Sequence, residues 1–304
     1  MPPALYHDTT IALALIALVL AVLVLWFVLW RAMGATMGLG RAGYAMVRRS
    51  GVWHRSEGAR AALQRRFPRT TRFVAARLDP SDFAGLPLTL LIAAGIYLAA
   101  LFGGLVEDVL ENTGVEAFDE AVFNAVAPFR SDWLVAALAW VTDLGASATL
   151  VAVSIVGTGF LWTRGPRADI ATLWVTLLGA EATSYAGKYL VDRTRPDFVL
   201  EIVAYTPSFP SGHTTGAMAV YGISAYVVAR GLATPRQRFA VAYWTGVLIA
   251  LVALSRVFLN VHFASDVLAG LLVGGFWILV GIAVAELTRA RGGATARGRG
   301  PAGP

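Results

Sequence analysis

Residues 264–287 read ASDVLAGLLVGGFWILVGIAVAEL, and this stretch decides the fold class. Only Ser265, Asp266 and Glu286 interrupt a run that is otherwise apolar or glycine. A helix needs about 20 predominantly apolar residues to cross the hydrocarbon core of a bilayer, so this run is long enough to span it. The stretch therefore predicts a membrane-spanning helix with a carboxylate at its beginning.

The composition of the whole chain agrees with a membrane protein. Of its 304 residues, 57% are hydrophobic and only 14% are charged, and the mean hydropathy is +0.64. Soluble domains usually carry about 25% charged residues. The chain contains no cysteine, which excludes disulfides, thiolate metal sites and cysteine nucleophiles.

Further apolar runs lie outward from this stretch, and each is long enough to be a helical span. No positively charged segment precedes the first of them, and no small-residue cleavage site follows it, so it is a poor signal peptide. Another run is interrupted by Asp143 and Gly145. The sequence predicts an all-α, polytopic bundle with one extra N-terminal span and six core spans. The runs before residue 264 are 11–30, 86–106, 133–162, 168–190, 213–230 and 239–258.

Four segments follow from these boundaries. We expect an N-terminal transmembrane anchor (1–31), a basic cytoplasmic linker (32–85), a six-span domain (86–287) and a basic tail (288–304). The tail consists mainly of glycine, alanine, arginine and proline and has too little apolar surface to order itself, so we expect disorder. Within an acidic segment, Phe118, Val122 and Val126 recur at helical spacing, which predicts a short interfacial helix.

The loop charges predict an orientation. Basic segments occur at 31–77, at the turns near 164–167 and 230–238, and in the tail, and an even number of predicted spans separates each from the next. Positive loops stay in the cytoplasm, so the acidic segment 107–120 is expected on the opposite side. The net charge of +6 then reflects cytoplasmic loops beside anionic lipid. No nucleic-acid-binding motif accompanies it, so we predict no nucleic-acid partner.

The first of three polar clusters is Lys188-x6-Arg195-Pro196, at the outer end of a predicted span. A guanidinium binds phosphate oxygens in a bidentate manner, while lysine acts as a compact point charge. Pro196 disfavours helical backbone at Arg195, which places this arginine in a loop. The alternative is a pair of ordinary cations that snorkel at a span end.

The second cluster, Pro210-Ser211-Gly212-His213, opens the next predicted span. Ser211 is a natural N-cap, and a helix N-terminus offers free amides and a favourable dipole to an anion. Gly212 lets the backbone approach a ligand closely. His213 then lies where it could protonate a leaving alkoxide. The alternative is a plain loop-to-helix junction.

The third cluster is Ser255-Arg256-x5-His262-x3-Asp266. His262 and Asp266 are separated by four residues, so on one helix they would share a face. The carboxylate could hold one ring nitrogen and leave the lone pair of the other free to attack phosphorus. The alternatives are a capping pair without chemistry and a metal site. Only Asp266 could join the two histidines as a ligand, and the surrounding cations would repel a metal.

Taken together, the three motifs resemble those of the type 2 phosphatidic acid phosphatase superfamily, over residues 85–287. The resemblance implies a six-helix core, a metal-independent reaction without a cofactor, and a phosphohistidine intermediate. It implies that His262 is the nucleophile, Asp266 its orienting partner and His213 the general acid. The phosphate-binding residues that it implies are Lys188, Arg195, Ser211, Gly212, His213 and Arg256.

The resemblance and the predicted orientation imply a lipid phosphatase of the bacterial inner membrane with its site facing the periplasm. The substrate would be a lipid phosphate or diphosphate, with undecaprenyl diphosphate as the first choice. Phosphatidic acid, phosphatidylglycerol phosphate and lipid A phosphates remain rivals. A phosphotransferase is an alternative, as is a lipid transporter or scaffold with a vestigial site. Glu181, within a predicted span, either pairs with Ser184, Tyr185 or Asp143 or acts on Lys188 or a lipid headgroup.

Overall fold

Every regular element of the computed structural model is a helix over the residues that it describes, which are 3–49, 58, 61–196 and 206–298. The prediction of an all-α chain is confirmed. Residues 50–57 and 59–60 of the predicted linker and 299–304 of the predicted tail lie outside the described residues. The main helices are α1 (Pro3–Arg49), α3 (Pro68–Arg77), α4 (Leu86–Glu111), α5 (Val115–Val126), α6 (Asp132–Thr142), α7 (Ser147–Arg164), α8 (Ala168–Val191), α9 (Gly212–Gly231), α10 (Pro235–Phe258) and α11 (Ala264–Gly298).

The chain divides into two units, residues 1–74 and residues 75–304. In the first unit, α1 contains a candidate span at Val19–Gly40. The sequence predicts that the anchor ends at residue 31, whereas α1 continues to Arg49, because no proline interrupts the chain there. In the second unit, α11 likewise continues to Gly298 where a disordered tail is predicted from residue 288.

Four described helices are long and apolar enough to cross a membrane, and a fifth span is possible if a bent helix pair counts as one. This pair is Asp132–Gly145 with Ser147–Arg164, bent by 48°. The helix predicted at 133–162 is thus broken at Asp143–Gly145, the two residues that interrupt this apolar run in the sequence. The other two predicted spans, α8 and α9, are 24 and 20 residues long. They are more polar than the four helices above and do not meet the same criterion of length and apolarity.

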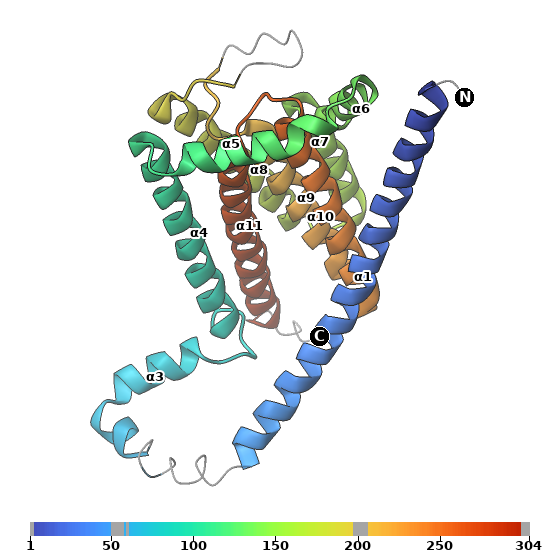
Figure 1. Ribbon diagram of the computed structural model, residues 1–304. Helices are drawn as coiled ribbons and strands as arrows, with labels where there is room; N and C mark the ends of the chain where they lie inside the picture. The colour runs from blue at the N-terminus through green and yellow to red at the C-terminus, as the bar shows by residue number, and fades with distance from the viewer. Residues whose placement is uncertain (1–2, 50–57, 59–60, 197–205, 299–304) are drawn as a thin grey trace. The chain divides into compact units, whose positions relative to one another are not determined.

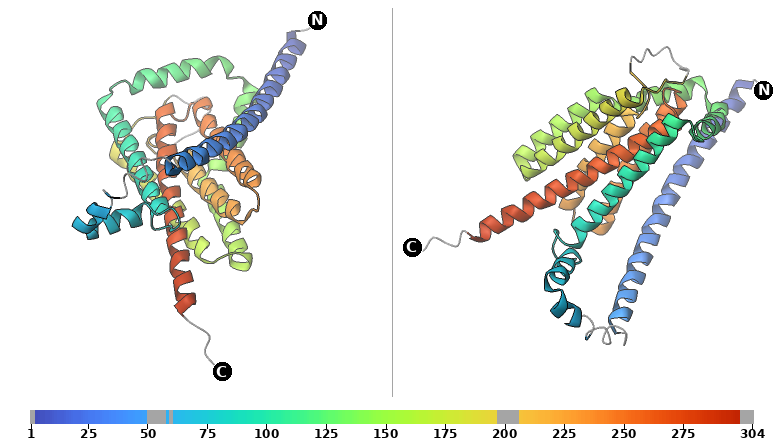
Figure 2. Two further views of the ribbon diagram at one scale, coloured as in Figure 1. Left: turned by 90° about the horizontal axis from the view of Figure 1, so that it is seen from below. Right: turned by 90° about the vertical axis from the view of Figure 1, so that its left-hand side faces the viewer.

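The polarity of α8 and α9 follows from their place inside the second unit. α8 packs against α7, α9 and α11, and α9 packs against α7, α8, α10 and α11 (Figures 1 and 2). The buried positions of both helices carry hydroxyl residues, among them Thr172, Thr176, Thr214 and Thr215. Small and hydroxyl residues at such interfaces let helices in a membrane approach closely. At Gly274 of α11, an added methyl group would lie 2.6 Å from Cβ of Met218 on α9. α9 and α11 can therefore pack in close contact because Gly274 has no side chain.

The predicted short helix in the acidic segment is confirmed as α5, which lies across the ends of the bundle helices in Figure 1. Val122 and Val126 pack against the end of α10 and the beginning of α11. Phe118 does not share this contact and remains 44% exposed. The buried positions of α5 are instead Val115 and Asp119, one helical turn apart. A carboxylate therefore faces the bundle from this helix.

Candidate active site

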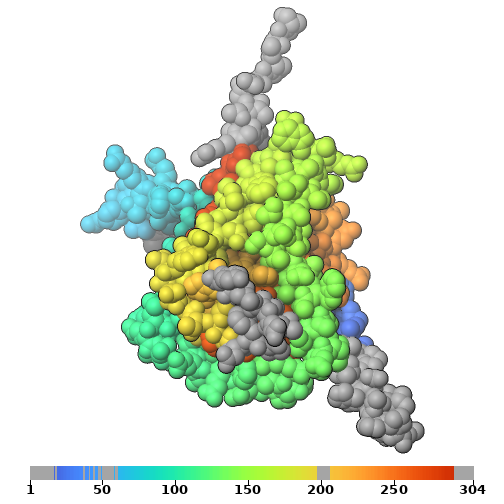
Figure 3. All heavy atoms as spheres, turned by 90° about the horizontal axis from the view of Figure 1, so that it is seen from above, coloured from blue at the N-terminus to red at the C-terminus, as the bar shows by residue number. Residues whose placement is uncertain are grey.

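The three polar clusters meet at one end of the bundle, which Figure 3 views from above. Lys188 lies in the last turn of α8, Gly212 begins α9, Arg256 lies in the last turn of α10, and Asp266 lies in the first turn of α11. Successive helices run in opposite directions, so two helix ends and two helix beginnings gather at this face. The alternation brings residues that are far apart in the sequence into one site.

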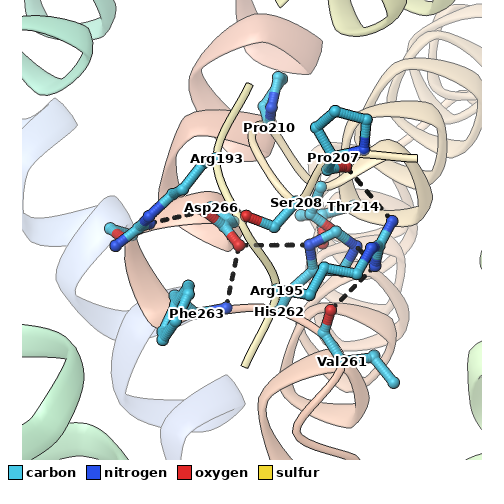
Figure 4. Close-up of polar contacts among 12 residues, drawn as sticks. Arg193, Arg195, Pro207, Ser208, Pro210, Thr214, Val261, His262, Phe263 and Asp266 are labelled. Carbon is cyan, nitrogen blue, oxygen red and sulfur yellow. Dashed lines mark hydrogen bonds and ion pairs between the residues drawn. The ribbon is translucent and has the colours of Figure 1, made fainter. Parts of the chain in front are cut away.

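His262 and Asp266 form a buried pair, with side chains 2% and 0% exposed. Nδ1 of His262 lies 3.3 Å from Oδ2 of Asp266, and the same oxygen accepts a hydrogen bond of 3.0 Å from the amide of Phe263 (Figure 4). The two residues do not lie on one helix, because α11 begins only at Ala264. His262 lies in the preceding turn, and the carboxylate reaches back to it.

The second ring nitrogen of His262 faces a cation. Nη1 of Arg195 lies 3.2 Å from Nε2 of His262 (Figure 4), and a guanidinium can only donate, so Nε2 presents its lone pair. Burial, followed by the charges of Arg256, Arg195 and Lys188, holds the pKa of His262 well below its usual range. The imidazole is therefore neutral at neutral pH, with Nδ1–H directed toward Asp266.

Arg195 is held rigidly by the chain around it. Its Nε donates to the carbonyl of Thr206 at 2.8 Å, and its Nη1 donates to the carbonyl of Val261 at 2.9 Å. Nη2 donates to the hydroxyl of Thr206 at 3.1 Å. These bonds join the α8–α9 connection to the α10–α11 turn and place the guanidinium beside His262. Its orientation is therefore set without a ligand.

Arg256 and Ser184 carry buried polar atoms that have no hydrogen-bond partner in the described part of the chain. Nη1 of Arg256 donates to the hydroxyl of Thr142 at 2.6 Å, but its Nε has no partner among the described residues. The hydroxyl of Ser184 also lacks one. Unsatisfied buried polar groups are rare and call for a specific explanation. An anion that accepts hydrogen bonds at this place would provide one for Arg256.

Lys188 holds the loop that precedes α9. Its Nζ donates to the carbonyls of Pro207 at 2.8 Å and Pro210 at 3.1 Å, and the residue is 9% exposed. An ammonium has three donors, so these two bonds leave one for a ligand. The lysine thus combines a structural contact with a charge directed into the site.

The predicted N-cap at Ser211 is correct in position, but its side chain does not bond a backbone amide. Its hydroxyl instead accepts from the hydroxyl of Thr214 at 3.1 Å, and its amide donates to the carbonyl of Asp266 at 3.0 Å. A methyl group added at Gly212 would have Ser184 Oγ 3.7 Å away as its nearest protein neighbour. The protein alone therefore does not require glycine there, whereas a ligand at the N-terminus of α9 would.

His213 lies in the first turn of α9. Its electrostatic neighbours are Lys188 and Arg195 of the first motif and Arg256 and His262 of the third. The backbone break after α6 packs closely against His213, since a methyl group added at Gly145 would lie 3.1 Å from Cβ of His213. The structure thus brings together all the residues that the sequence singles out at this site.

Several site residues were not found from the sequence. They are Asp119 on α5, Thr142 at the end of α6, Arg193 and Ser208 in the α8–α9 connection, and Ser265 at the beginning of α11. Arg193 had a visible signal, because it is a further cation inside the Lys188–Arg195 motif. Asp119 and Thr142 had none, since the chain brings them to the site from more than a hundred residues away.

Glu181 lies inside the bundle on α8, next to Gly216 of α9. A methyl group at Gly216 would lie 2.7 Å from Oε1 of Glu181. Of the partners predicted for Glu181, which were Ser184, Tyr185 and Asp143, Ser184 forms no hydrogen bond with it, because the hydroxyl of Ser184 has no partner among the described residues. The carboxylate does contribute to the electrostatic environment of Lys188.

In the part of the chain that the structure describes, no three or more histidine, aspartate or glutamate side chains come together in an arrangement that could hold an ion.

An all-α membrane bundle with a buried histidine–aspartate pair facing three cations defines a membrane enzyme that acts on phosphate esters. The chain belongs to the PAP2 superfamily, whose sequence model matches residues 169–289. It is 32% identical over 177 residues to phosphatidylglycerophosphatase B of Bacillus subtilis, which covers 57% of this chain and 86% of that protein.

Two further similarities support this assignment. The chain is 30% identical over 166 residues to a lipid A 1-phosphatase of Rhizobium etli, covering 46% of this chain and 66% of that protein. The crystal structure of a PAP2-type phosphatidylglycerolphosphate phosphatase from Bacillus subtilis superposes with a TM-score of 0.57 at 30% identity. That match covers 62% of this chain and 94% of the other.

Proposed function

We propose that this protein is a membrane lipid phosphatase that releases phosphate from a lipid phosphate or diphosphate through a covalent intermediate on His262. The observation that carries the proposal is the geometry of this histidine. One ring nitrogen lies beside a buried carboxylate, and the other presents a lone pair to a cationic site. The PAP2 relatives named above support the reaction class.

In the first half of the reaction, Nε2 of His262 attacks the terminal phosphorus, and the bond from this phosphorus to the leaving oxygen breaks. The leaving oxygen is the ester oxygen of a lipid phosphate or the bridging anhydride oxygen of a lipid diphosphate. It takes a proton from His213, which must be protonated when substrate is bound. The dianionic phosphate favours that state because it offsets the neighbouring cations. Asp266 stabilises the positive charge that develops on the His262 ring. In the second half, water attacks the phosphohistidine, gives a proton to His213 and releases inorganic phosphate.

The phosphate group is bound by the cations of the site and by the beginning of α9. Arg256 offers its unpartnered Nε, Lys188 offers its remaining N–H, and the first amides of α9 point toward an anion. Arg195 stands next to the attacking nitrogen and neutralises the equatorial oxygens. Charge stabilisation by fixed donors is usually the largest contribution in phosphoryl transfer, so these groups serve where other phosphatases use metal ions.

The substrate is a lipid whose headgroup enters from the end of the bundle. A cavity of about 610 Å³ borders His262 and is lined by Asn260, Phe263, Phe123 and Arg130. This volume lies within the range of small-molecule sites, and its mixed lining suits a polar head on an apolar tail. Undecaprenyl diphosphate is the first substrate to test, because an outward-facing enzyme meets it. Phosphatidylglycerol phosphate and lipid A 1-phosphate, for which the relatives are named, come next.

The orientation follows from charge at the two ends of the second unit. The site and the acidic α5 lie at one end, while the turns with Arg164, Arg167, Arg230 and Arg236 lie at the other, because α8 and α10 begin there. Basic turns remain in the cytoplasm. The active site therefore faces the periplasm of a bacterial inner membrane.

Phosphate release by purified protein from a panel of lipid phosphates and diphosphates in detergent tests this proposal. We expect release that survives a chelator and is inhibited by vanadate, which can adopt the geometry of the transition state on His262. His262→Ala should be inactive. A His262→Ala variant with substantial activity, or activity that is lost in chelator and restored by a divalent metal, would refute the mechanism. Transfer of phosphate to an added alcohol instead of water would indicate a phosphotransferase.

A further inference from the structure

Arg193 lies between two buried carboxylates, and the mechanism above does not use it. Its Nη1 is 2.7 Å from Oδ1 of Asp266, and its Nη2 is 2.8 Å from Oδ2 of Asp119. The two carboxylate side chains are 0% and 3% exposed, and that of Arg193 is 14% exposed. The guanidinium also stacks on the ring of Phe263, 4.2 Å from its centre. Figure 4 shows this arginine reaching Asp266 from the side away from His262.

Asp119 is in turn held by the beginning of α11. Its Oδ1 accepts from the amide of Ser265 at 2.8 Å, and its Oδ2 accepts from the hydroxyl of Ser265 at 2.6 Å. That hydroxyl also lies 2.7 Å from Nη1 of Arg193. A carboxylate at a helix N-terminus is favourable because of the free amides and the helix dipole. Asp119 is therefore a fixed anchor that α5 contributes to the site.

The two oxygens of Asp266 have separate partners as a result. Oδ1 accepts a hydrogen bond from Arg193, whereas Oδ2 accepts one from the Phe263 amide and contacts Nδ1 of His262. The arginine thus prevents the carboxylate from rotating away from the imidazole. It also supplies the positive charge that a fully buried carboxylate needs to remain ionised. Only an ionised, correctly rotated Asp266 can select the Nδ1–H tautomer and stabilise the charged ring.

We propose that Arg193, held by Asp119, is a positioning residue for the catalytic carboxylate. It keeps Asp266 charged and directed at His262, and it touches neither substrate nor the attacking nitrogen. The inference rests on the proposed role of His262 and Asp266. It makes α5 part of the catalytic machinery, because the helix that covers the end of the bundle carries the anchor.

A double-mutant cycle separates this role from simple anchoring of the loop. Arg193→Ala should lower kcat by about 100-fold, the size expected when a reacting group is misplaced by about 1 Å, and leave KM nearly unchanged. Arg193→Lys should recover part of the loss because it retains the charge. In an Asp266→Asn background, Arg193→Ala should cost less than about 3-fold, since residues that act as a unit are not additive. An equal loss in both backgrounds would overturn the proposal.

Variants of Asp119 complete the test. Asp119→Asn should lower kcat in the same direction as Arg193→Ala but by less. Glu111→Gln, which removes an exposed carboxylate at the end of α4, is the matched control and should retain full activity. If Arg193→Ala does not yield folded protein by thermal unfolding in detergent, Arg193→Lys and Asp119→Asn decide the question. Full activity in both would then refute the proposal. Persistent activity in His262→Ala would instead refute the proposed function itself.

Discussion

For single residues, the proposed mechanism gives His262 and His213 different roles, and substrates with different leaving groups can distinguish them. An aryl phosphate releases a weakly basic phenolate, whereas an alkyl lipid phosphate releases an alkoxide that needs a proton. His213→Ala should therefore lower kcat by about 10²- to 10⁴-fold for alkyl esters and much less for aryl esters. Asp266→Asn should lower both rates alike, because it disturbs the nucleophile. Equal losses on both substrates for His213→Ala would contradict its role as the acid.

The neutral state of His262 predicts a dependence of stability on pH. Burial and three neighbouring cations hold its pKa in the folded state well below the usual range, whereas the unfolded chain binds a proton near pH 6.5. The unfolded state therefore binds more protons below about pH 6.5, and the free energy of unfolding contributed by this group falls as the pH falls. Tm in detergent should decrease less between pH 7.5 and pH 5 for His262→Gln than for the parent. Identical slopes would show that the pKa is not depressed.

Among the helices, the break between α6 and α7 creates contacts with candidate site residues. It places Thr142 against Arg256 and Gly145 against His213. A methyl group at Gly145 would lie 2.6 Å from Cγ1 of Val252 and 3.1 Å from Cβ of His213. Gly145→Ala should displace His213 and lower kcat for alkyl esters by at least about 10-fold. Gly103→Ala on α4, where no atom lies within 4 Å of the added methyl group, is the control and should be silent.

At the end of the bundle away from the site, a second polar cluster connects α8, α9 and α11. Asp169, at the beginning of α8 and 1% exposed, contacts Arg230 on α9 at 3.6 Å and Arg289 on α11. Removal of this carboxylate leaves two arginines without their shared buried partner. Because both arginines keep some access to solvent, Asp169→Ala should cost about 1–3 kcal/mol of stability, with a lower Tm in detergent. Asp132→Asn, at an exposed position in the first turn of α6, should leave Tm unchanged.

At the scale of the whole molecule, the absence of cysteine makes the orientation testable by thiol labelling. Asn124 is exposed on α5 at the site end, and Ala233 is exposed in the basic turn between α9 and α10. In cells with a permeable outer membrane, an impermeant thiol reagent should label Asn124→Cys and spare Ala233→Cys, since positive turns resist translocation. The opposite pattern would put the site in the cytoplasm and favour a lipid of the inner leaflet over undecaprenyl diphosphate.

Features that depend on residues close together in the chain could be predicted from the sequence. Long apolar runs specify membrane helices because the bilayer requires about 20 residues of low polarity. The three motifs specify Lys188, Arg195, His213, Arg256 and Asp266, because their chemistry and spacing are visible within short segments. The helical period in the acidic segment likewise predicted α5.

Contacts between side chains that are far apart in the sequence, by contrast, depend on the tertiary structure. Asp119 meets Ser265 across 146 residues, and Thr142 meets Arg256 across 114, and no local pattern predicts such pairs. The break at Asp143–Gly145 and the polar character of α8 and α9 have the same origin, since packing inside the bundle determines what each helix end must contact. Sequence specifies which side chains are available, whereas the distances that make them a catalytic site depend on how the helices pack.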